Sequence, residues 1–288
     1  MRLLRLLTIF FLLSCLSCSK DPATFELENL NNGEIGCFGH AGMGFYSSYP
    51  VNSWPGFESC LTRGADGSEM DIRLRKDSVL VIIHSANLEE TTSCSGYVED
   101  LNWSEISDCK IKSNFFNNSK LLSLDEFIEK LENPKNYIFT WDCKLSKFDQ
   151  DYYDIYSRAI VRTINKYDLA RNVFIENPFY DFLQKIKDKK NDANLFILAE
   201  DFDEGMRKVK EHDFFGLSMH NHKVTTEQVK EAHNENVRVT IYGVLSDKEN
   251  YSAIEKCPDY IQTDNINYLL KVFEKYNRHK GFLRSLTK

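Results

Sequence analysis

The sequence has no long apolar run once its first residues are passed. A helix needs about 20 consecutive apolar residues to cross a bilayer, and no later stretch of this chain is apolar over that length. Basic residues are in the minority, with 36 Lys and Arg against 43 Asp and Glu and a formal net charge of −7. This balance argues against nucleic acid as the main partner, because phosphate-binding surfaces are basic. It still allows an enzyme that acts on phosphates with the help of a metal ion.

Paired metal-binding cysteines are also missing. None of the six cysteines beyond the N-terminal segment shows C-x-x-C spacing, so the sequence does not predict a zinc site. In an oxidising compartment some cysteines can pair, and Cys94 with Cys109 would close a short loop. Spacing does not fix the connectivity, and ordinary buried thiols are the alternative for most of the cysteines beyond the N-terminal segment, which are Cys37, Cys60, Cys94, Cys109, Cys143 and Cys257.

The N-terminus has the pattern of an export signal. Arg2 and Arg5 form a basic start, residues 6–13 form a short apolar segment, and Leu-Leu-Ser-Cys15-Leu-Ser-Cys18 follows. This is similar to bacterial lipoprotein signals, in which a lipidated cysteine becomes the first residue of the mature protein. Cys18 is the preferred site, Cys15 is the alternative, and an ordinary cleaved signal with incidental cysteines is the other interpretation. We expect a signal peptide at 1–18, a tether at 19–33, and an exported lipoprotein anchored to a membrane, in the periplasm or on the outer-membrane surface.

Internal repeats and low-complexity segments are absent, and short apolar runs alternate with helical patterns. Capping boxes mark two helix starts, Ser123 with Glu126 and Thr225 with Gln228. Repeated alternation of strand and helix predicts parallel strands joined by right-handed crossovers. The runs expected to be strands of this kind are 35–38, 68–74, 137–142, 173–175, 195–198, 214–217, 237–242 and 260–262.

Another apolar run, at 79–83, follows the second strand too closely for a parallel crossover. We therefore expect an antiparallel hairpin, with a turn near Lys76 and Asp77 that brings His84 back towards Glu69. A chain of 288 residues, 42% of them hydrophobic, is long enough for one α/β barrel to use nearly all of it. The sequence thus predicts a TIM (β/α)8 barrel over 34–280, with a hairpin excursion and an inserted loop region at 85–122 after the second strand.

Titratable side chains gather at the ends of the predicted strands, where barrel enzymes place their chemistry. His40 ends the first strand, His84 ends the hairpin, and Glu69 and Asp71 lie two apart, so that both face one side of their strand. Asp142 and Lys144 repeat this spacing at the end of the run 137–142. Three carboxylates suit a hard divalent cation, and two histidines suit acid and base roles near neutral pH.

A structural alternative exists for the carboxylates, since Glu69 and Asp71 could form ion pairs with Arg73 or Lys144 instead. Two carboxylates on one face of a barrel interior repel each other, and a bound cation relieves this better than one lysine does. We expect the remaining histidines to be surface or core residues without a catalytic role; they are His212, His220, His222, His233 and His279.

The order of these motifs resembles the glycerophosphodiester phosphodiesterase signature. The resemblance rests on Gly-Ala-Asp-Gly-Ser-Glu69-Met-Asp71, then Asp77 and His84, and it covers about residues 36–270. Cys94-Ser-Gly-Tyr-Val-Glu-Asp100 is similar to the family's loop after its second histidine. Asp142-x-Lys144 is similar to its acidic-x-Lys strand end, and Gln262-Thr-Asp264 to its closing Thr-Asp.

The resemblance implies a barrel of the phosphatidylinositol-phospholipase-C-like phosphodiesterase type, with roles for its residues. His40 and His84 would be the general acid and base. Glu69, Asp71 and Asp142 would hold one divalent cation, Ca²⁺ or Mg²⁺, which neutralises charge on the phosphoryl oxygens. Lys144 would contact the phosphate as a point charge.

Several substrate contacts depart from the family pattern. Ala41 stands where the family has an arginine after its first histidine, and Arg73, on the same face as Asp71, is the candidate to replace it. Pro-Val51-Asn52-Ser keeps the family's asparagine but loses its acid, and Tyr242 stands near the place of a tryptophan. Arg73, Asn52 and Tyr242 are therefore expected beside the substrate, with its identity less defined than the reaction class.

The expected function is hydrolysis of glycerophosphodiesters to glycerol 3-phosphate and an alcohol, with a small-molecule substrate and a membrane lipid anchor as partners. One alternative is a related barrel phosphodiesterase, such as a lysophospholipase D or a phosphatidylinositol phospholipase C-like enzyme. Another is a lipoprotein that binds a phosphodiester without cleaving it, which Ala41 and Val51 favour. The two histidines count against that alternative, because binding alone needs no acid–base pair.

Overall fold

The computed structural model describes residues 25–116 and 118–274. The predicted signal peptide, Cys15, Cys18 and the last residues of the predicted barrel region lie outside this part of the chain. Among the helices of the described segments, none is both long and apolar enough to cross a bilayer.

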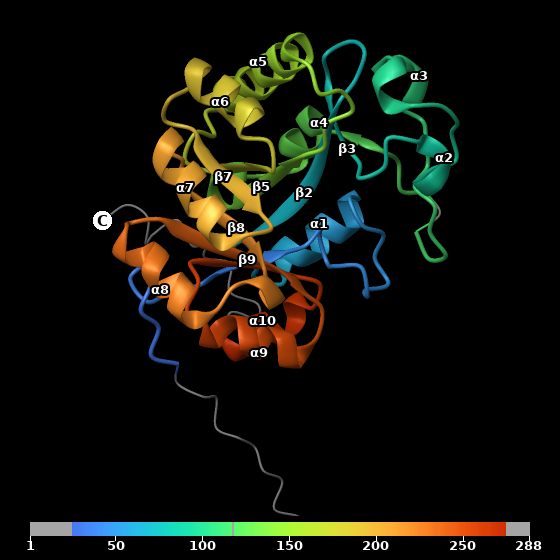
Figure 1. The fold of residues 1–288 in the computed structure, drawn as a ribbon. Coiled ribbons are helices and arrows are strands. Elements are labelled where there is room, and N and C mark those ends of the chain that lie inside the picture. Colours follow the sequence, from blue (N-terminus) through green and yellow to red (C-terminus); the bar gives the residue numbers. More distant parts are fainter. Residues whose placement is uncertain (1–24, 117, 275–288) are drawn as a thin grey trace, which may run out of the picture.

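The described residues form a closed barrel of parallel strands with helices between them (Figure 1). The strand at 36–39 pairs with both the strand at 260–263 and the strand at 67–74, and these two pairings close the sheet. This confirms the predicted TIM barrel. In order around it the strands are β1 (Gly36–Gly39), β2 (Gly67–Leu74), β5 (Ile138–Cys143), β6 (Val173–Asn177), β7 (Asn194–Ala199), β8 (Gly216–His220), β9 (Arg238–Val244) and β10 (Tyr260–Thr263).

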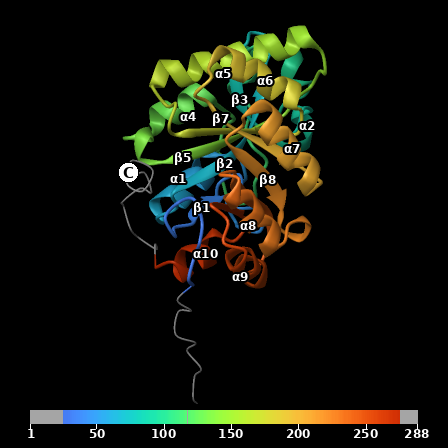
Figure 2. The same cartoon turned by 60° about the vertical axis from the view of Figure 1, so that its left-hand side comes forward.

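Helices cover the outside of the barrel (Figure 2). Apolar residues of the strands that point outwards pack on the apolar faces of these helices and form the main core. The capping boxes predicted at Ser123 and Thr225 are present. The helices of the barrel are α1 (Trp54–Thr62), α4 (Leu124–Lys130), α5 (Gln150–Tyr167), α6 (Tyr180–Lys189), α7 (Phe202–His212), α8 (Thr226–Asn234), α9 (Asp247–Glu255) and α10 (Ile266–Val272).

The interior of the barrel changes from apolar to charged along its axis. Successive inward positions on a strand are two residues apart, so Tyr260 and Gln262 on β10 lie at successive levels. The lowest level is a buried cluster without charge, made of Phe38, Ile138, Phe174, Phe196 and Tyr260. These rings close the amino-terminal end of the barrel, and the polar residues above them face the other end, which we call the mouth.

A hairpin leaves the barrel after β2, as predicted. β3 (Leu80–Ile82) runs antiparallel to β2, and the two-residue strand β4 (Leu122–Ser123), which the sequence did not indicate, pairs with β3. Between β3 and β4 lie α2 (Leu88–Thr91), a 3-10 turn (Val98–Asp100) and α3 (Trp103–Ile106). Figure 1 shows α2 and α3 set apart from the barrel helices.

The segment between β3 and β4, which we call the insertion, has its own small core. A disulfide joins Cys94 to Cys109, and Cys109 is buried with Leu88, Val98 and Ile106. The connectivity that spacing alone left open is therefore settled for this pair, while Cys60 and Cys143 are buried thiols outside this disulfide. The disulfide thus stabilises the insertion, whose own apolar core is small.

The N-terminal part of the described chain is fastened below β1, at the amino-terminal end of the barrel. The backbone N–H of Leu30 donates to Asp259 Oδ1 at 2.9 Å, and Asn31 Nδ2 donates to the Asp259 carbonyl at 3.0 Å. The other Asp259 carboxylate oxygen accepts from the Val239 N–H at 2.8 Å. Asp259 is fully buried, so this carboxylate joins residues 30–31 to the start of β9.

Candidate active site at the barrel mouth

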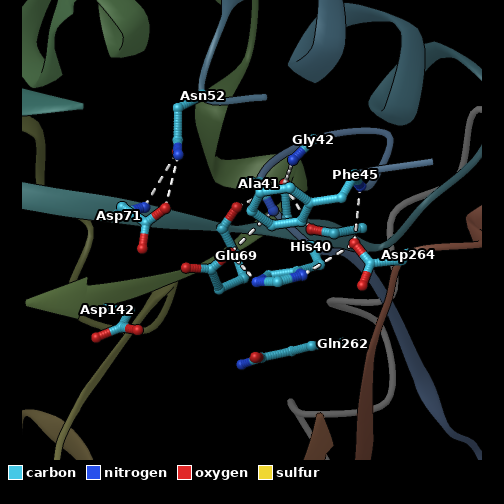
Figure 3. A network of polar contacts seen from close by, with 12 residues as sticks. His40, Ala41, Gly42, Phe45, Asn52, Glu69, Asp71, Asp142, Gln262 and Asp264 are labelled. Atoms are coloured by element: carbon cyan, nitrogen blue, oxygen red, sulfur yellow. Dashed lines mark hydrogen bonds and ion pairs between the residues drawn. The ribbon is translucent and has the colours of Figure 1, made fainter. Parts of the chain in front are cut away.

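Three carboxylates meet inside the barrel, as the sequence predicted. Glu69 and Asp71 lie on β2 and Asp142 on β5, and Asp71 and Asp142 are partners in the register of the two strands. One oxygen from each of the three lies within 4.8 Å of the others. They form the only group with metal-ligand geometry that the described residues contain, and Figure 3 shows it beside His40.

Asp71 is held as an anion by its neighbours. Asn52 Nδ2 donates to Asp71 Oδ2 at 2.6 Å, and Lys144 Nζ lies 3.0 Å from Asp71 Oδ1. Burial opposes ionisation, but the charge of Lys144, that of His84 and the Asn52 hydrogen bond outweigh it and lower the Asp71 pKa. Asn52, which the sequence led us to expect beside the substrate, thus forms a hydrogen bond with one of the three carboxylates.

Asp142 and Lys144 form a second short pair at the end of β5. Lys144 Nζ lies 2.5 Å from Asp142 Oδ2. Burial raises the Asp142 pKa despite the lysine, and the charge of Asp71 adds to the effect. The structural alternative is therefore realised in part, since Lys144 pairs with two of the three carboxylates.

Lys144 forms ion pairs with Asp71 and Asp142 but not with Glu69. Glu69 Oε2 accepts from the Ala41 N–H at 2.9 Å, and Glu69 Oε1 is buried without a hydrogen-bond partner. Burial and the charge of Asp71 raise the Glu69 pKa well above its usual range. An unpartnered buried oxygen facing two further carboxylates fits a divalent cation with oxygen ligands.

His40 lies over Glu69 and is oriented by a fourth carboxylate. Its Nδ1 is 3.0 Å from Asp264 Oδ1, and its Nε2 is 3.8 Å from Glu69 Oε2 (Figure 3). Burial would lower the His40 pKa, but the Asp264 hydrogen bond and the charges of Glu69 and Asp264 raise it to about 9. The centroid of the Phe45 ring lies 5.1 Å from that of the imidazole ring, and the two rings are tilted relative to each other.

The loop after β1 brings His40 and Asp264 together. The Phe45 N–H donates to Asp264 Oδ1 at 2.8 Å, so one oxygen serves both residues. Gly44 has a φ of +87°, and a Cβ there would lie 2.3 Å from the Asp264 carbonyl oxygen. Only glycine permits this approach. Ala41, in place of the expected arginine, is fully buried in this loop with a φ of +48°.

His84 approaches the carboxylates from the hairpin. The Ile83 N–H donates to the Asp71 carbonyl at 2.9 Å, and the charge of His84 acts on the Asp71 carboxylate. The hairpin thus brings His84 back to the strand that carries Glu69 and Asp71. Arg73 Nε donates to the His84 carbonyl at 2.8 Å, and its Nη1 donates to Ser146 Oγ at 3.1 Å. Arg73 therefore orders the rim around His84.

Tyr242 lies two residues before the end of β9. Burial and the charges of Glu200, Glu176 and Asp142 raise its pKa to about 12, which places the hydroxyl in an acidic surrounding. Its ring meets the His220 ring edge to face at 5.4 Å. Tyr242 can donate a hydrogen bond to an anion here but does not ionise near neutral pH.

Glu176, on β6, is a buried carboxylate that sequence reasoning missed. It is the register partner of Asp142 on the adjacent strand. Its Oε2 accepts from Ser218 Oγ at 2.7 Å and from Gln262 Nε2 at 3.1 Å. Burial and the nearby Asp142 raise its pKa to about 7. The available signal was an acidic residue at an inward position of an apolar strand.

The other histidines lie away from the three carboxylates. His212 stacks on Phe214 and Tyr180, and His233 Nε2 lies 3.0 Å from Asp259 Oδ2 at the opposite end of the barrel. His220 and His222 lie at the end of β8, where His222 Nε2 is 3.3 Å from Glu249 Oε1. His279 lies outside the described residues.

Comparison with known proteins finds the family that the sequence motifs resemble. A model of the Glycerophosphoryl diester phosphodiesterase family matches residues 43–268. A glycerophosphodiester phosphodiesterase of Bacillus altitudinis is 28% identical over 144 residues, which is 45% of this chain and 59% of that relative. The chain thus spans less than two thirds of the curated relatives that it matches.

Solved structures share the fold at low sequence identity. A phosphodiesterase of Oleispira antarctica, solved in complex with the product sn-glycerol-3-phosphate, has a TM-score of 0.73 at 16% identity and covers 82% of this chain and 96% of that chain. A glycerophosphodiester phosphodiesterase of Parabacteroides distasonis has a TM-score of 0.70 at 19% identity, over 84% and 99% of the two chains. Because the family model spans most of the barrel, from the loop after β1 to α10, the chain belongs to the glycerophosphoryl diester phosphodiesterase family.

Proposed function

We propose that this protein hydrolyses glycerophosphodiesters to glycerol 3-phosphate and an alcohol. The observation that supports this best is the unpartnered Glu69 Oε1 in a cluster of three carboxylates with a histidine on each side. His40 lies 3.8 Å from Glu69 and His84 is close enough to Asp71 to lower its pKa. Such an arrangement suits acid–base cleavage of a phosphodiester better than binding alone.

Glu69, Asp71 and Asp142 would hold one divalent cation, Ca²⁺ or Mg²⁺, because all three offer oxygen ligands and together carry more negative charge than Lys144 offsets. When bound, such an ion neutralises charge that develops on the phosphoryl oxygens. Asn52 keeps Asp71 oriented for this role through the 2.6 Å hydrogen bond. The family relationship supports a metal requirement but leaves the identity of the ion open.

The two histidines would move the protons of the reaction. One imidazole accepts the proton of a neighbouring glycerol hydroxyl as that oxygen attacks phosphorus. The phosphorus–oxygen bond to the alcohol breaks, and the leaving oxygen takes a proton from the other imidazole. Water then opens the cyclic phosphate with the two histidines in reversed roles, which restores both. Asp264 holds His40 in position, and Lys144, Arg73 and Tyr242 provide cationic or hydrogen-bonding groups at the mouth.

The direct test is release of glycerol 3-phosphate from glycerophosphocholine and glycerophosphoethanolamine by a chain beginning near residue 20. The assay is run with Ca²⁺, with Mg²⁺ and with a chelator. We expect metal-dependent turnover that falls by about 10²–10⁴-fold in His40→Ala and in His84→Ala. His222→Ala, at an exposed histidine of the rim, is the matched control and should keep its activity.

Substrate panels separate the alternatives. Turnover of lysophospholipids or phosphatidylinositol without turnover of glycerophosphodiesters would identify a lysophospholipase D or a phospholipase C-like enzyme. Binding of glycerophosphocholine without turnover in either metal would contradict the enzymatic proposal and leave a phosphodiester-binding lipoprotein.

We also propose that the protein is exported and lipid-anchored at Cys18. The Cys94–Cys109 disulfide supports export, since such bonds persist in oxidising compartments. Labelled fatty acid should enter the full chain and the Cys15→Ser variant but not Cys18→Ser. Labelling lost only in Cys15→Ser would move the site to Cys15, and no labelling in any variant would contradict the anchor.

A further inference from the structure

A cavity of about 290 Å³ opens beside His84, between the loop after β1 and the insertion. Phe45, Asn52 and His84 are among the residues that line it. Phe45 is also the ring that lies beside His40, and Asn52 is also the residue that donates a hydrogen bond to Asp71. The cavity is therefore continuous with the place where the phosphate of a substrate would lie.

The walls of this cavity are mainly hydrocarbon. On the side of the loop after β1 they include Val51, directly before Asn52, and on the side of the hairpin and the insertion Ile83, Ile111 and Leu121. Its charged lining residues are Glu90 and Lys112, both exposed, one of each sign, and Lys112 Nζ donates to the Glu89 carbonyl. A cationic or polyhydroxyl group would lose its hydration here and would find few polar side chains to replace it, so its binding would be unfavourable.

The cavity is built from parts that are fixed in place. Leu121 belongs to the buried core of the insertion that contains the disulfide cysteine Cys109. The Tyr49 and Phe116 rings stack at 5.0 Å and join the loop after β1 to the insertion. A preformed apolar cavity binds an apolar group without the cost of ordering its walls.

We propose that this cavity binds an uncharged apolar group attached to the phosphodiester, and that it selects such substrates over those with a charged group. This inference rests on the proposed function. The volume is just below the range for ligand pockets, about 300–1,000 Å³, so it suits one short substituent and not a whole lipid. That substituent is either a leaving alcohol or a short chain on the glycerol.

The test compares kcat/KM for three substrates in one panel. Glycerophosphocholine is the reference, the n-hexyl ester of glycerol 3-phosphate places the apolar group on the alcohol, and 1-hexanoyl-glycerophosphocholine places it on the glycerol. Val51→Glu puts a charge in the wall, and Val51→Met is its matched control, with similar length and no charge. Ile111→Ala enlarges the cavity from the insertion, away from Asn52.

We expect Val51→Glu to lower kcat/KM for at least one apolar substrate about 10-fold or more relative to glycerophosphocholine. Val51→Met should keep that ratio within about threefold, and Ile111→Ala should lower it by several-fold. Loss of preference for the hexyl ester assigns the cavity to the alcohol, and loss for the hexanoyl compound assigns it to the glycerol side. Unchanged ratios in both Val51→Glu and Ile111→Ala, with glycerophosphocholine still hydrolysed, would overturn the proposal and leave the proposed function standing.

A binding measurement separates failure of the cavity inference from failure of the proposed function. Hexylphosphonate and methylphosphonate, which cannot be hydrolysed, are titrated calorimetrically in the presence of Mg²⁺ or Ca²⁺. We expect the wild-type protein to prefer hexylphosphonate and Val51→Glu to lose about 10-fold of that preference. Equal affinity for both phosphonates in the wild-type protein would overturn the inference about the cavity, whether or not the protein turns over any diester.

Discussion

Glu69 and Asp71 show how one strand gives two carboxylates opposite properties. Both face the barrel interior, and both are almost completely buried. Lys144 and Asn52 lower the Asp71 pKa, whereas Glu69 receives one backbone N–H and keeps an unpartnered oxygen, so its pKa is raised. A bound cation would offset the free-energy cost of burying the Glu69 carboxylate with one oxygen unpartnered.

Glu69→Gln should therefore separate stability from function. Without metal we expect the variant to be more stable than the wild-type protein at pH 8, on the order of 1 kcal/mol, because a buried charge is removed. With metal at about 100 times its Kd, the wild-type protein should gain about 2.7 kcal/mol and the variant much less. Thermal unfolding with and without Mg²⁺ or Ca²⁺ measures both effects.

Glu58→Gln, on the exposed side of α1, is the control for this change. It should behave as the wild-type protein in both buffers. A metal-induced rise in Tm that is equal in Glu69→Gln and the wild-type protein would show that Glu69 is not a ligand.

Glu176 gives a pH dependence of stability. Its folded pKa of about 7 lies above its ordinary value of 4.5, so its favourable contribution is present below about pH 4.5 and is lost as the pH rises through 7. Glu176→Gln removes this dependence. We expect the variant to gain stability relative to the wild-type protein between pH 5 and pH 8, by at most about 3 kcal/mol.

Urea unfolding at both pH values measures the difference between Glu176→Gln and the wild-type protein. The glutamine can still accept from Ser218 and bond to Gln262, so packing is preserved. A gain of the same size at pH 5 and pH 8 would contradict the assignment of the raised pKa to Glu176.

At the scale of elements, the insertion depends on its disulfide more than the barrel does. Cys94 and Cys109 are separated by 15 residues, and closing a loop of that length contributes about 3 kcal/mol in the chain-entropy view. Replacing both cysteines by serine should loosen residues between β3 and β4 while β2 and β5 stay protected. Hydrogen exchange resolves the two regions.

Cys37→Ser is the comparison for that variant, because Cys37 is a buried residue of β1 in the barrel wall. It should affect exchange around β1 and leave the insertion unchanged. Uniform loosening of barrel and insertion in the double variant would contradict an independent insertion core.

The sequence allowed the strands and the paired carboxylates to be predicted because strands buried on both faces are continuous apolar runs, and inward positions recur every two residues. The helices α7 and α9 could not be placed individually, since their exposed faces are strongly polar and their apolar positions few. Glu176 was missed because one acid in an apolar run carries no motif. The Asp264 contact with His40 joins residues 224 apart in the sequence, and no local pattern reports such a distance.

At the scale of the whole molecule, barrel closure depends on the short strand β1. Asp259 lies at the start of β10 and accepts from both Leu30 and Val239. Asp259→Ala would leave these buried N–H groups without partners, and each loss costs about 1–3 kcal/mol. We expect a loss of about 3 kcal/mol, measured by urea unfolding and by a lower Tm.

Asp108→Ala is the control for this variant, because Asp108 is 90% exposed and pairs only with Lys120 at the surface of the insertion. Its effect should stay within about 0.5 kcal/mol. A similar small effect in Asp259→Ala would show that residues 30–31 are not needed to close the barrel.

The fastening of residues 30–31 below β1 also sets an orientation. Those residues lie at the end of the barrel opposite the mouth, and the chain between the proposed lipid at Cys18 and Phe25 reaches at most about 25 Å when fully extended. With the proposed lipid in a membrane, the closed end of the barrel would be the end tethered to the bilayer, and the mouth would be the end away from it. The protein would then act on soluble diesters that diffuse to the cell surface, and not on the lipids of the membrane to which it is anchored.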